Sequence, residues 1–294
     1  MILCVAGNPS IDKLFEIDRI ELGSLHRPSH FVQVPGGKGL NVARAASSLG
    51  APVMVTGVLA GHAGRWIDDE LTAEGVGHRF VWAESGETRS SLSVAESDHA
   101  HLTEFYEAGT PLTGEDWGAL ETTVGELLSR ASWIAISGSL PPGAPDEGYV
   151  GLVPLTRTAL DSRAAGIDAR PAVVKLNESE AGVGAGGAVA AARQLHERSG
   201  GAAIVTRGRA GAVLVTPDGA AMTGRLDADG AYPVGSGDAF LAGLVVALDG
   251  GADWPEALRA GLGAGAANAA IPGAGRLDRA TAERLAGEAG ITPE

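Results

Sequence analysis

Two glycines and one acid stand directly before an apolar helical run, in the stretch from Tyr232 to Leu248. The small residues Gly235, Ser236 and Gly237 allow neighbouring backbone N–H groups to turn inward together. A helix that begins near Asp238 points the positive end of its dipole at the same place, which suits a phosphate oxygen. A carboxylate there would repel phosphate, but it suits a base that takes a proton from an attacking hydroxyl group. The tract indicates phosphoryl transfer, or else a plain turn in which Asp238 caps the helix.

A second glycine turn, from Pro35 to Arg44, also leads into a helical pattern. It is not a Walker P-loop, because glycine follows Lys38 and the four-residue spacer between the glycines is missing. Its backbone N–H groups and Asn41 could hold sugar hydroxyls or a phosphate. The alternative is a loop that does no more than start a helix.

An amide and two acids follow the strand-like run that begins at Val173, namely Asn177, Glu178 and Glu180. Amide and carboxylate oxygens suit Mg²⁺, which usually keeps several waters and binds beside triphosphate oxygens. The same residues could instead cap a helix, with Asn177 turned towards Glu180.

The elements that must position these clusters alternate between strand and helix. Apolar runs predict strands at 2–7, 53–61, 133–138, 202–208 and 211–215, and helical patterns lie at 40–49, 63–75, 116–131, 188–199, 241–248, 254–270 and 281–289. This alternation predicts an α/β fold with a mostly parallel sheet covered by helices. The first strand is not followed by the G-x-G-x-x-G of a dinucleotide-binding unit.

Two β-rich patches, at about 11–34 and 87–106, interrupt this alternation and predict a separate small sheet. Within the second patch, His99 and His101 have strand spacing, but no third zinc ligand is evident nearby. We interpret them as part of a solvated loop.

Composition restricts the class of protein. The 294 residues carry 36 acids and 22 bases, a net charge of −14, which argues against nucleic acid or an anionic membrane as partner but not against a small anionic substrate. No apolar run is long enough for a membrane span. The single cysteine, Cys4, cannot form an internal disulfide, and no signal peptide is visible, so we expect a cytoplasmic protein.

Seven segments in order resemble the phosphofructokinase B-type sugar kinases of the ribokinase-like superfamily, closest to the tagatose 6-phosphate kinase and 1-phosphofructokinase branch. They are NPSID (8–12), GGKGLNVARAASSLG (36–50), GETRSSL (86–92), ISGSLPPG (136–143), KLNESE (175–180), TRGRAG (206–211) and PVGSGDAFLAG (233–243). The resemblance implies one ribokinase-like kinase domain over residues 1–294. Its two β-rich patches would form a discontinuous lid that closes over the sugar and often pairs with the lid of a second subunit in a homodimer.

The resemblance also implies roles for individual residues. Asp238 matches the catalytic base, and the tract Gly235, Ser236 and Gly237 matches the anion hole for the transferred phosphate. The positions that match sugar contacts are Asp12, Gly37, Lys38 and Asn41, with Ser139 nearby, and Arg89 matches a residue that reaches the phosphate already on the substrate. Those that match the ATP site are Lys175, Asn177, Thr206, Gly208, Gly211 and Asn268, with Asn177 and Glu180 associated with Mg²⁺. Whether a monovalent cation lies behind the anion hole stays open.

Some residues depart from the family pattern. Leu176 replaces a usual proline, the segment from 144 to 174 is short, and LDSRAAG (160–166) only loosely resembles the family's aspartate-serine-glycine turn. Ser24 and Glu104 stand where phosphofructokinases of this type tend to offer basic residues to the sugar phosphate, although tagatose-type relatives also carry an acid at the second position.

We therefore expect a kinase that transfers a phosphoryl group from ATP to a hydroxymethyl group of a ketohexose phosphate of the fructose 6-phosphate, tagatose 6-phosphate or fructose 1-phosphate type. A kinase for an unphosphorylated sugar or nucleoside is the first alternative, favoured by Ser24 and Glu104 and opposed by Arg89. A sugar- or nucleotide-binding regulator with a dead kinase site is the second, favoured by the short middle segment and opposed by the intact Asp238.

Overall fold

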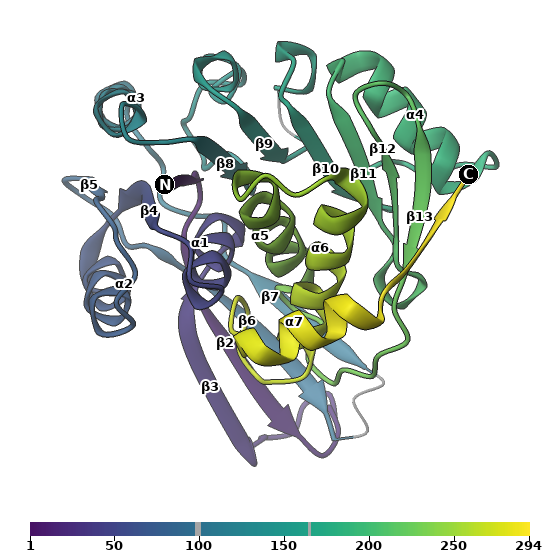
Figure 1. Ribbon diagram of the computed structural model, residues 1–294. Coiled ribbons are helices and arrows are strands. Elements are labelled where there is room, and N and C mark those ends of the chain that lie inside the picture. The colour runs from purple at the N-terminus through teal and green to yellow at the C-terminus, as the bar shows by residue number, and fades with distance from the viewer. Residues whose placement is uncertain (98–100, 164–165) are drawn as a thin grey trace.

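The computed structural model describes residues 1–97, 101–163 and 166–294, so His99 and residues 164–165 of the LDSRAAG segment lie outside the described residues. Figure 1 shows a large sheet with helices on both of its faces and a small sheet that projects from one end. Among the described residues, no helix combines the length and the apolar character that crossing a membrane requires.

The large sheet has the strand order β14-β13-β12-β11-β10-β9-β8-β1-β4-β5. Strands β5 to β11 in this order run parallel, and β12, β13 and β14 are added antiparallel at one edge. The bounds are β1 Ile2–Ala6, β4 Val53–Leu59, β5 Val81–Trp82, β8 Trp133–Ser137, β9 Thr158–Asp161, β10 Val173–Asn177, β11 Ala202–Thr206, β12 Ala212–Val215, β13 Ala221–Arg225 and β14 Gly290–Pro293. The predicted α/β class with a mostly parallel sheet is confirmed.

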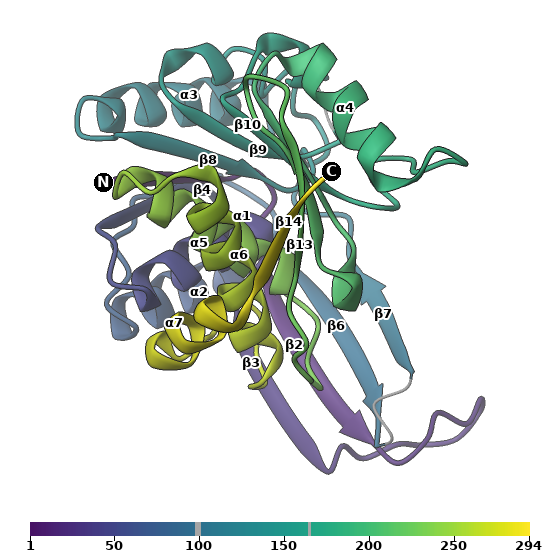
Figure 2. The same ribbon diagram turned by 45° about the vertical axis from the view of Figure 1, so that its right-hand side comes forward.

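Both faces of the sheet are covered, because apolar side chains alternate between two cores along each central strand. In β1, Cys4 packs into one core and Val5 into the other. The first core lies under α1 (Lys38–Ser48), α2 (Gly61–Ala73), α5 (Ser236–Asp249), α6 (Trp254–Ala269) and α7 (Arg279–Glu288). The second lies under α3 (Gly114–Leu128) and α4 (Gly187–Ser199), and Figure 2 shows these two helices on the opposite side of the sheet.

The small sheet has the order β3-β2-β6-β7, with bounds β2 Ser10–Ile17, β3 His30–Gly36, β6 Arg89–Glu96 and β7 Leu102–Tyr106. Its central strands β2 and β6 are parallel, although about seventy residues separate them, and β3 and β7 pair antiparallel at the edges. The two β-rich patches predicted from sequence do form one separate sheet.

Sequence analysis missed four short strands, β5, β9, β13 and β14. The end strands β13 and β14 contain glycine or proline and little alternation, so no periodicity marks them. In the short middle segment, the described residues form the four-residue strand β9 and 3₁₀ turns at Val153–Leu155 and Ile167–Ala169, with no α-helix. Helix α5 begins at Ser236, two residues before Asp238, near which its start was predicted, and five residues before the apolar pattern at 241, because the glycine tract itself forms its first turn.

Candidate active site

The polar clusters meet at the carboxyl ends of the parallel strands, where ligand sites form in open α/β sheets. Asn8 follows β1, Ser139 follows β8, Asp161 ends β9 and Asn177 ends β10. The N-termini of α1 and α5 face the same edge, since Asn41 of α1 donates a hydrogen bond to Asp238 of α5. Strand order thus assembles residues that are far apart in the chain.

Asp238 lies in the first turn of α5 and is only 6% exposed. The Asn41 Nδ2 group donates to its Oδ2 over 2.9 Å. Burial, and then repulsion from the Asp161 carboxylate, raise the pKa of Asp238 to about 7. A carboxyl group with such a pKa can accept a proton near neutral pH.

The glycine tract before Asp238 leaves two backbone donors free. Gly235 has φ = 83°, a left-handed conformation that favours glycine. The N–H groups of Ser236 and Asp238 donate to the carbonyls of Pro233 and Gly235, at 3.1 and 3.0 Å. Within the described residues, those of Gly235 and Gly237 have no acceptor. These two N–H groups, at a helix N-terminus, are suited to an anion.

Two lysines share one buried carboxylate beside this tract. Asp161 is fully buried, with Oδ1 3.0 Å from Lys38 Nζ and Oδ2 2.7 Å from Lys175 Nζ. Burial by itself would raise the pKa of Asp161, but the two ammonium groups hold it below its ordinary value. Burial would lower the pKa of Lys38, yet the surrounding carboxylates, Asp161 foremost, raise it. Asp161 is therefore ionised and Lys38 is protonated at neutral pH.

Lys175 reaches the glycine tract itself. A Cβ built on Gly237 would lie 2.9 Å from Lys175 Nζ, so the ammonium group lies against the N-terminus of α5. Positive charge from the lysine and from the helix end meets here, next to the Gly237 N–H. This arrangement fits a phosphoryl group.

Asn177 and Glu180 bond to each other. The Asn177 N–H donates to Glu180 Oε2 over 3.0 Å, and the Glu180 N–H donates to Asn177 Oδ1 over 2.8 Å. This is the geometry of a capping box, but a turn follows it, and α4 begins only at residue 187. Glu180 Oε1 also lies 2.6 Å from Lys38 Nζ.

A metal ion at this turn would need further ligands from a bound substrate. No group of three or more His, Cys, Asp or Glu side chains able to hold a metal occurs within the described ranges. The donors Asn177 and Glu180 fit Mg²⁺ in its usual form, with one or two carboxylates supplemented by phosphate oxygens and waters.

At the base of the small sheet, Asp12 accepts hydrogen bonds from Ser10 Oγ at 2.6 Å and from the Gly37 N–H at 3.2 Å. Burial raises the pKa of Asp12. Asn41 Oδ1 is buried and has no hydrogen-bond partner among the described residues, so an acceptor is left over for a hydroxyl group.

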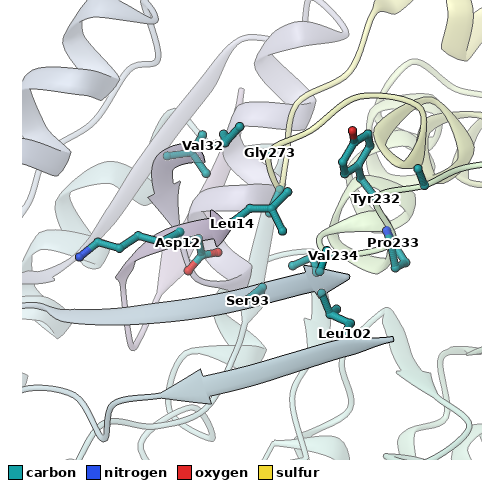
Figure 3. Close-up of a pocket in the computed structure, with 14 residues that line it drawn as sticks. Asp12, Leu14, Val32, Ser93, Leu102, Tyr232, Pro233, Val234 and Gly273 are labelled. Carbon is teal, nitrogen blue, oxygen red and sulfur yellow. The ribbon is translucent and has the colours of Figure 1, made fainter. Parts of the chain in front are cut away.

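Asp12 opens onto a pocket between the small sheet and the segment before α5 (Figure 3). The walls of this pocket include Leu14, Val32, Ser93, Leu102, Tyr232, Pro233, Val234 and Gly273. Glu104 pairs with Ser93 across β6 and β7 and accepts a hydrogen bond from Tyr106 over 2.5 Å. Ser24 is exposed in the loop between β2 and β3.

The residues predicted for the nucleotide lie in two places. Thr206, at the end of β11, is the register partner of Asn177, and its hydroxyl donates to the Leu176 carbonyl over 3.4 Å. Gly208 and Gly211 follow with φ values of 55° and 90° in the adjoining turn. Asn268 instead is fully buried. Its amide donates to the Val234 carbonyl over 2.9 Å and accepts from the Gly275 N–H over 2.8 Å, which holds the loop before Gly235 in place.

Sequence analysis missed one residue of this site, Asp161. Its signal was the LDSRAAG segment, which matches the family's aspartate-serine-glycine turn too loosely to be placed. The structure shows that the aspartate of that segment is the carboxylate shared by Lys38 and Lys175.

Comparison with known proteins gives similarities over nearly the whole chain. The model of the pfkB family of carbohydrate kinases matches residues 5–280. A 1-phosphofructokinase from Haloferax volcanii is 32% identical over 275 residues, which cover 89% of this chain and 88% of that protein.

Solved structures are similar in fold. Phosphofructokinase-2 from Escherichia coli in complex with fructose-6-phosphate has a TM-score of 0.84 and 25% identity, with 97% of each chain covered. A ribokinase from Arabidopsis thaliana complexed with ribose and ATP has a TM-score of 0.74 and 19% identity, and covers 97% of this chain and 98% of that one. The second likeness concerns the fold alone, and it matches the predicted ribokinase-like architecture.

Proposed function

Because the chain belongs to the pfkB family and is a carbohydrate kinase, we propose that it transfers the γ-phosphoryl group of ATP to a hydroxymethyl group of a ketohexose phosphate. The observation that carries this proposal is the buried Asp238 carboxyl, held by Asn41 beside the N-terminus of α5 and the two lysines that share Asp161. A base and a cluster of positive charge stand together where the strands end. Phosphoryl transfer needs this combination.

In the proposed reaction, Asp238 accepts the hydroxymethyl proton as the sugar oxygen bonds to phosphorus and the bond between the β- and γ-phosphates breaks. Asn41 keeps the carboxylate oriented towards the substrate. Lys38 and Lys175, with the free N–H groups of the glycine tract, stabilise the charge on the transferred group.

We assign the ATP side of the site to the turn after β10 and the loop after β11. Lys175, Asn177, Thr206, Gly208 and Gly211 would hold the nucleotide, and Asn177 and Glu180 would hold Mg²⁺. When bound, Mg²⁺ supplies neutralisation of the phosphate charges. The buried position of Asn268 supports a role in shaping the anion hole rather than in touching the nucleotide.

We assign the sugar to the space between Asp12 and the small sheet, which would act as a lid. Asp12, Gly37 and Asn41 would contact its hydroxyls, Ser139 would lie nearby, and Arg89 would contact its phosphate. The 1-phosphofructokinase relative and the phosphofructokinase-2 complex with fructose-6-phosphate support a phosphorylated acceptor. Pairing of two lids in a homodimer and a monovalent cation behind the anion hole stay predictions.

An unphosphorylated sugar is the rival acceptor, and one observation favours it. Glu104 faces the same side of the small sheet as Asp12 and Ser93, where its carboxylate would repel a phosphate placed near it. The rival would leave the Arg89 guanidinium without a substrate anion.

A coupled ADP-release assay tests the proposal, with purified protein, Mg-ATP and fructose 6-phosphate, tagatose 6-phosphate, fructose 1-phosphate, fructose, ribose and adenosine in parallel. We expect turnover to be fastest with one of the three phosphosugars. Turnover confined to unphosphorylated compounds would establish the rival, and binding without any turnover would indicate a regulator. With the best acceptor, Asp238→Asn should lower kcat by about 10² to 10⁴ and leave ATP binding largely unchanged.

A further inference from the structure

We propose that Asn8 is a positioning residue that holds Arg89 as a free cation for the phosphate already on the sugar. The inference rests on the proposed function, since it requires a phosphorylated acceptor. It adds that selectivity for phosphosugars depends on the neutral amide of Asn8 as well as on Arg89 itself.

Asn8 makes most of the direct contacts of Arg89. The Arg89 Nε donates to Asn8 Oδ1 over 3.1 Å and, over 3.4 Å, to the Asn8 backbone carbonyl, and Nη2 donates to the same carbonyl over 3.1 Å. The remaining contact runs from Nη1 to Ser91 Oγ over 2.9 Å. Together these contacts fix the plane and the direction of the guanidinium.

These contacts use three of the five N–H donors of the Arg89 guanidinium. A guanidinium has five N–H groups, one on Nε and two on each terminal nitrogen. One N–H of Nη1 and one of Nη2 have no acceptor within the described parts of the chain. Two donors on neighbouring nitrogens match two oxygens of one phosphate.

The hydrogen-bond partners of Arg89 are all neutral, so none of them offsets its positive charge. In the described residues, no carboxylate lies within ion-pair distance of Arg89, although Asp12 and Glu107 act on it from further away. Burial lowers the pKa of Arg89, as expected for a cation that has lost water without gaining a paired acid. An anion brought by a substrate would supply the missing partner.

Asn8 is itself held from several sides. Its Nδ2 donates to Ser139 Oγ over 3.2 Å, so the same amide is a donor to Ser139 and an acceptor for Arg89. A Cβ on Gly109 would lie 2.4 Å from Asn8 Oδ1, and one on Gly37 would lie 3.0 Å from the Asn8 carbonyl oxygen. Gly109 thus leaves room for the Asn8 side-chain amide, and Gly37 leaves room for the Asn8 backbone carbonyl.

Arg89 is half-buried, so part of its side chain is open to solvent. Together with Asn8, Thr88 and Thr110, it lines a small hollow at the end of β1, whose walls also include apolar side chains such as Val58 and Leu112.

Steady-state kinetics of four variants test the proposal: Asn8→Ala, Asn8→Asp, Arg89→Ala and the Asn8→Ala/Arg89→Ala double variant. The acceptors are whichever of fructose 1-phosphate, fructose 6-phosphate and tagatose 6-phosphate the wild type uses best, and the same sugar without its phosphate. Ser90→Ala is the matched control, because this neighbour on β6 makes no side-chain bond to Arg89.

Asn8→Ala removes the bond from Arg89 Nε to Asn8 Oδ1 and keeps the two contacts to the backbone carbonyl. We expect it to raise the KM for the phosphosugar about 10- to 100-fold, the usual worth of one hydrogen bond to a charged group. The KM for ATP and the kcat/KM for the unphosphorylated sugar should change by less than about threefold. Asn8→Asp keeps the shape of the side chain but pairs Arg89 with a carboxylate, so it should raise the same KM at least as much. Ser90→Ala should behave as wild type.

The double variant distinguishes a positioning role of Asn8 towards Arg89 from a general effect of the Asn8 substitution on the structure. If Asn8 acts through Arg89, removing Asn8 in the Arg89→Ala background should change the phosphosugar KM by less than about twofold. Additive effects would overturn the inference. So would an unchanged KM in Asn8→Asp, which decides the matter if Asn8→Ala does not fold. If instead Arg89→Ala itself leaves the phosphosugar KM unchanged, it is the assignment of a phosphate to Arg89 in the proposed function that fails.

Discussion

Replacing Asp238 with asparagine should make the ligand-free protein more stable above neutral pH, even as it removes the proposed base. The native carboxyl is almost fully buried, and burial together with repulsion from Asp161 raises its pKa from an ordinary 3.8 to about 7. Asparagine has nearly the same shape as the protonated acid and never carries the charge. The substitution therefore removes a penalty that exists only when Asp238 is ionised.

The sign follows from proton binding. Between pH 3.8 and about 7, the native state holds a proton on Asp238 that the unfolded chain has lost. The contribution of Asp238 to the free energy of unfolding therefore falls as pH rises through this window and is constant above it. A pKa shift of about three units lowers the free energy of unfolding by about 4 kcal/mol at most. This is a large share of the stability of a typical domain.

Urea unfolding of both proteins at pH 4.5 and pH 8 measures this effect. The advantage of Asp238→Asn over wild type should be larger at pH 8 by about 3 kcal/mol, because part of the penalty is already present at pH 4.5. Asp249→Asn, at the exposed end of the same helix, controls for the change in net charge. An advantage that differs by less than about 0.5 kcal/mol between the two pH values would refute a strongly raised pKa for Asp238.

Three further substitutions probe the supports of the site. Asp161→Asn removes a negative charge near Asp238, leaves Lys175 without its carboxylate partner and leaves Lys38 paired with Glu180 alone, so the acidic limb of the kcat/KM profile should move about one to two pH units lower; an unmoved limb would contradict the coupling of the two acids. Gly36→Ala places a Cβ 2.0 Å from Asp12 Cγ and should raise the sugar KM about tenfold or more, with the KM for ATP as the internal control. Asn268→Ala should lower the free energy of unfolding by about 2 to 3 kcal/mol and lower kcat, and a normal kcat in a destabilised protein would show that the loop before Gly235 needs no such support.

The general architecture could be predicted from the chain because its signals are local. Strand β1 reads as a buried run, helix α6 shows its apolar period, and the two β-rich patches break the alternation of the large sheet. The last two strands, β13 and β14, could not be found this way, since short strands with glycine or proline carry no period. Their place is decided by pairing with β12 and with each other.

The sequence by itself determined the glycine tract before Asp238, the glycine turn around Lys38 and the order of the family's segments. Only the tertiary structure decided how these parts act on one another. The contact between Asn41 and Asp238 spans 197 positions, and the one between Lys38 and Asp161 spans 123. Neither leaves a periodic trace, because such contacts depend on the order in which β1, β8, β9 and β10 lie side by side. The same packing excludes water from Asp161 and Asp238 and so sets their pKa values in opposite directions, one held low by two lysines and the other raised by burial.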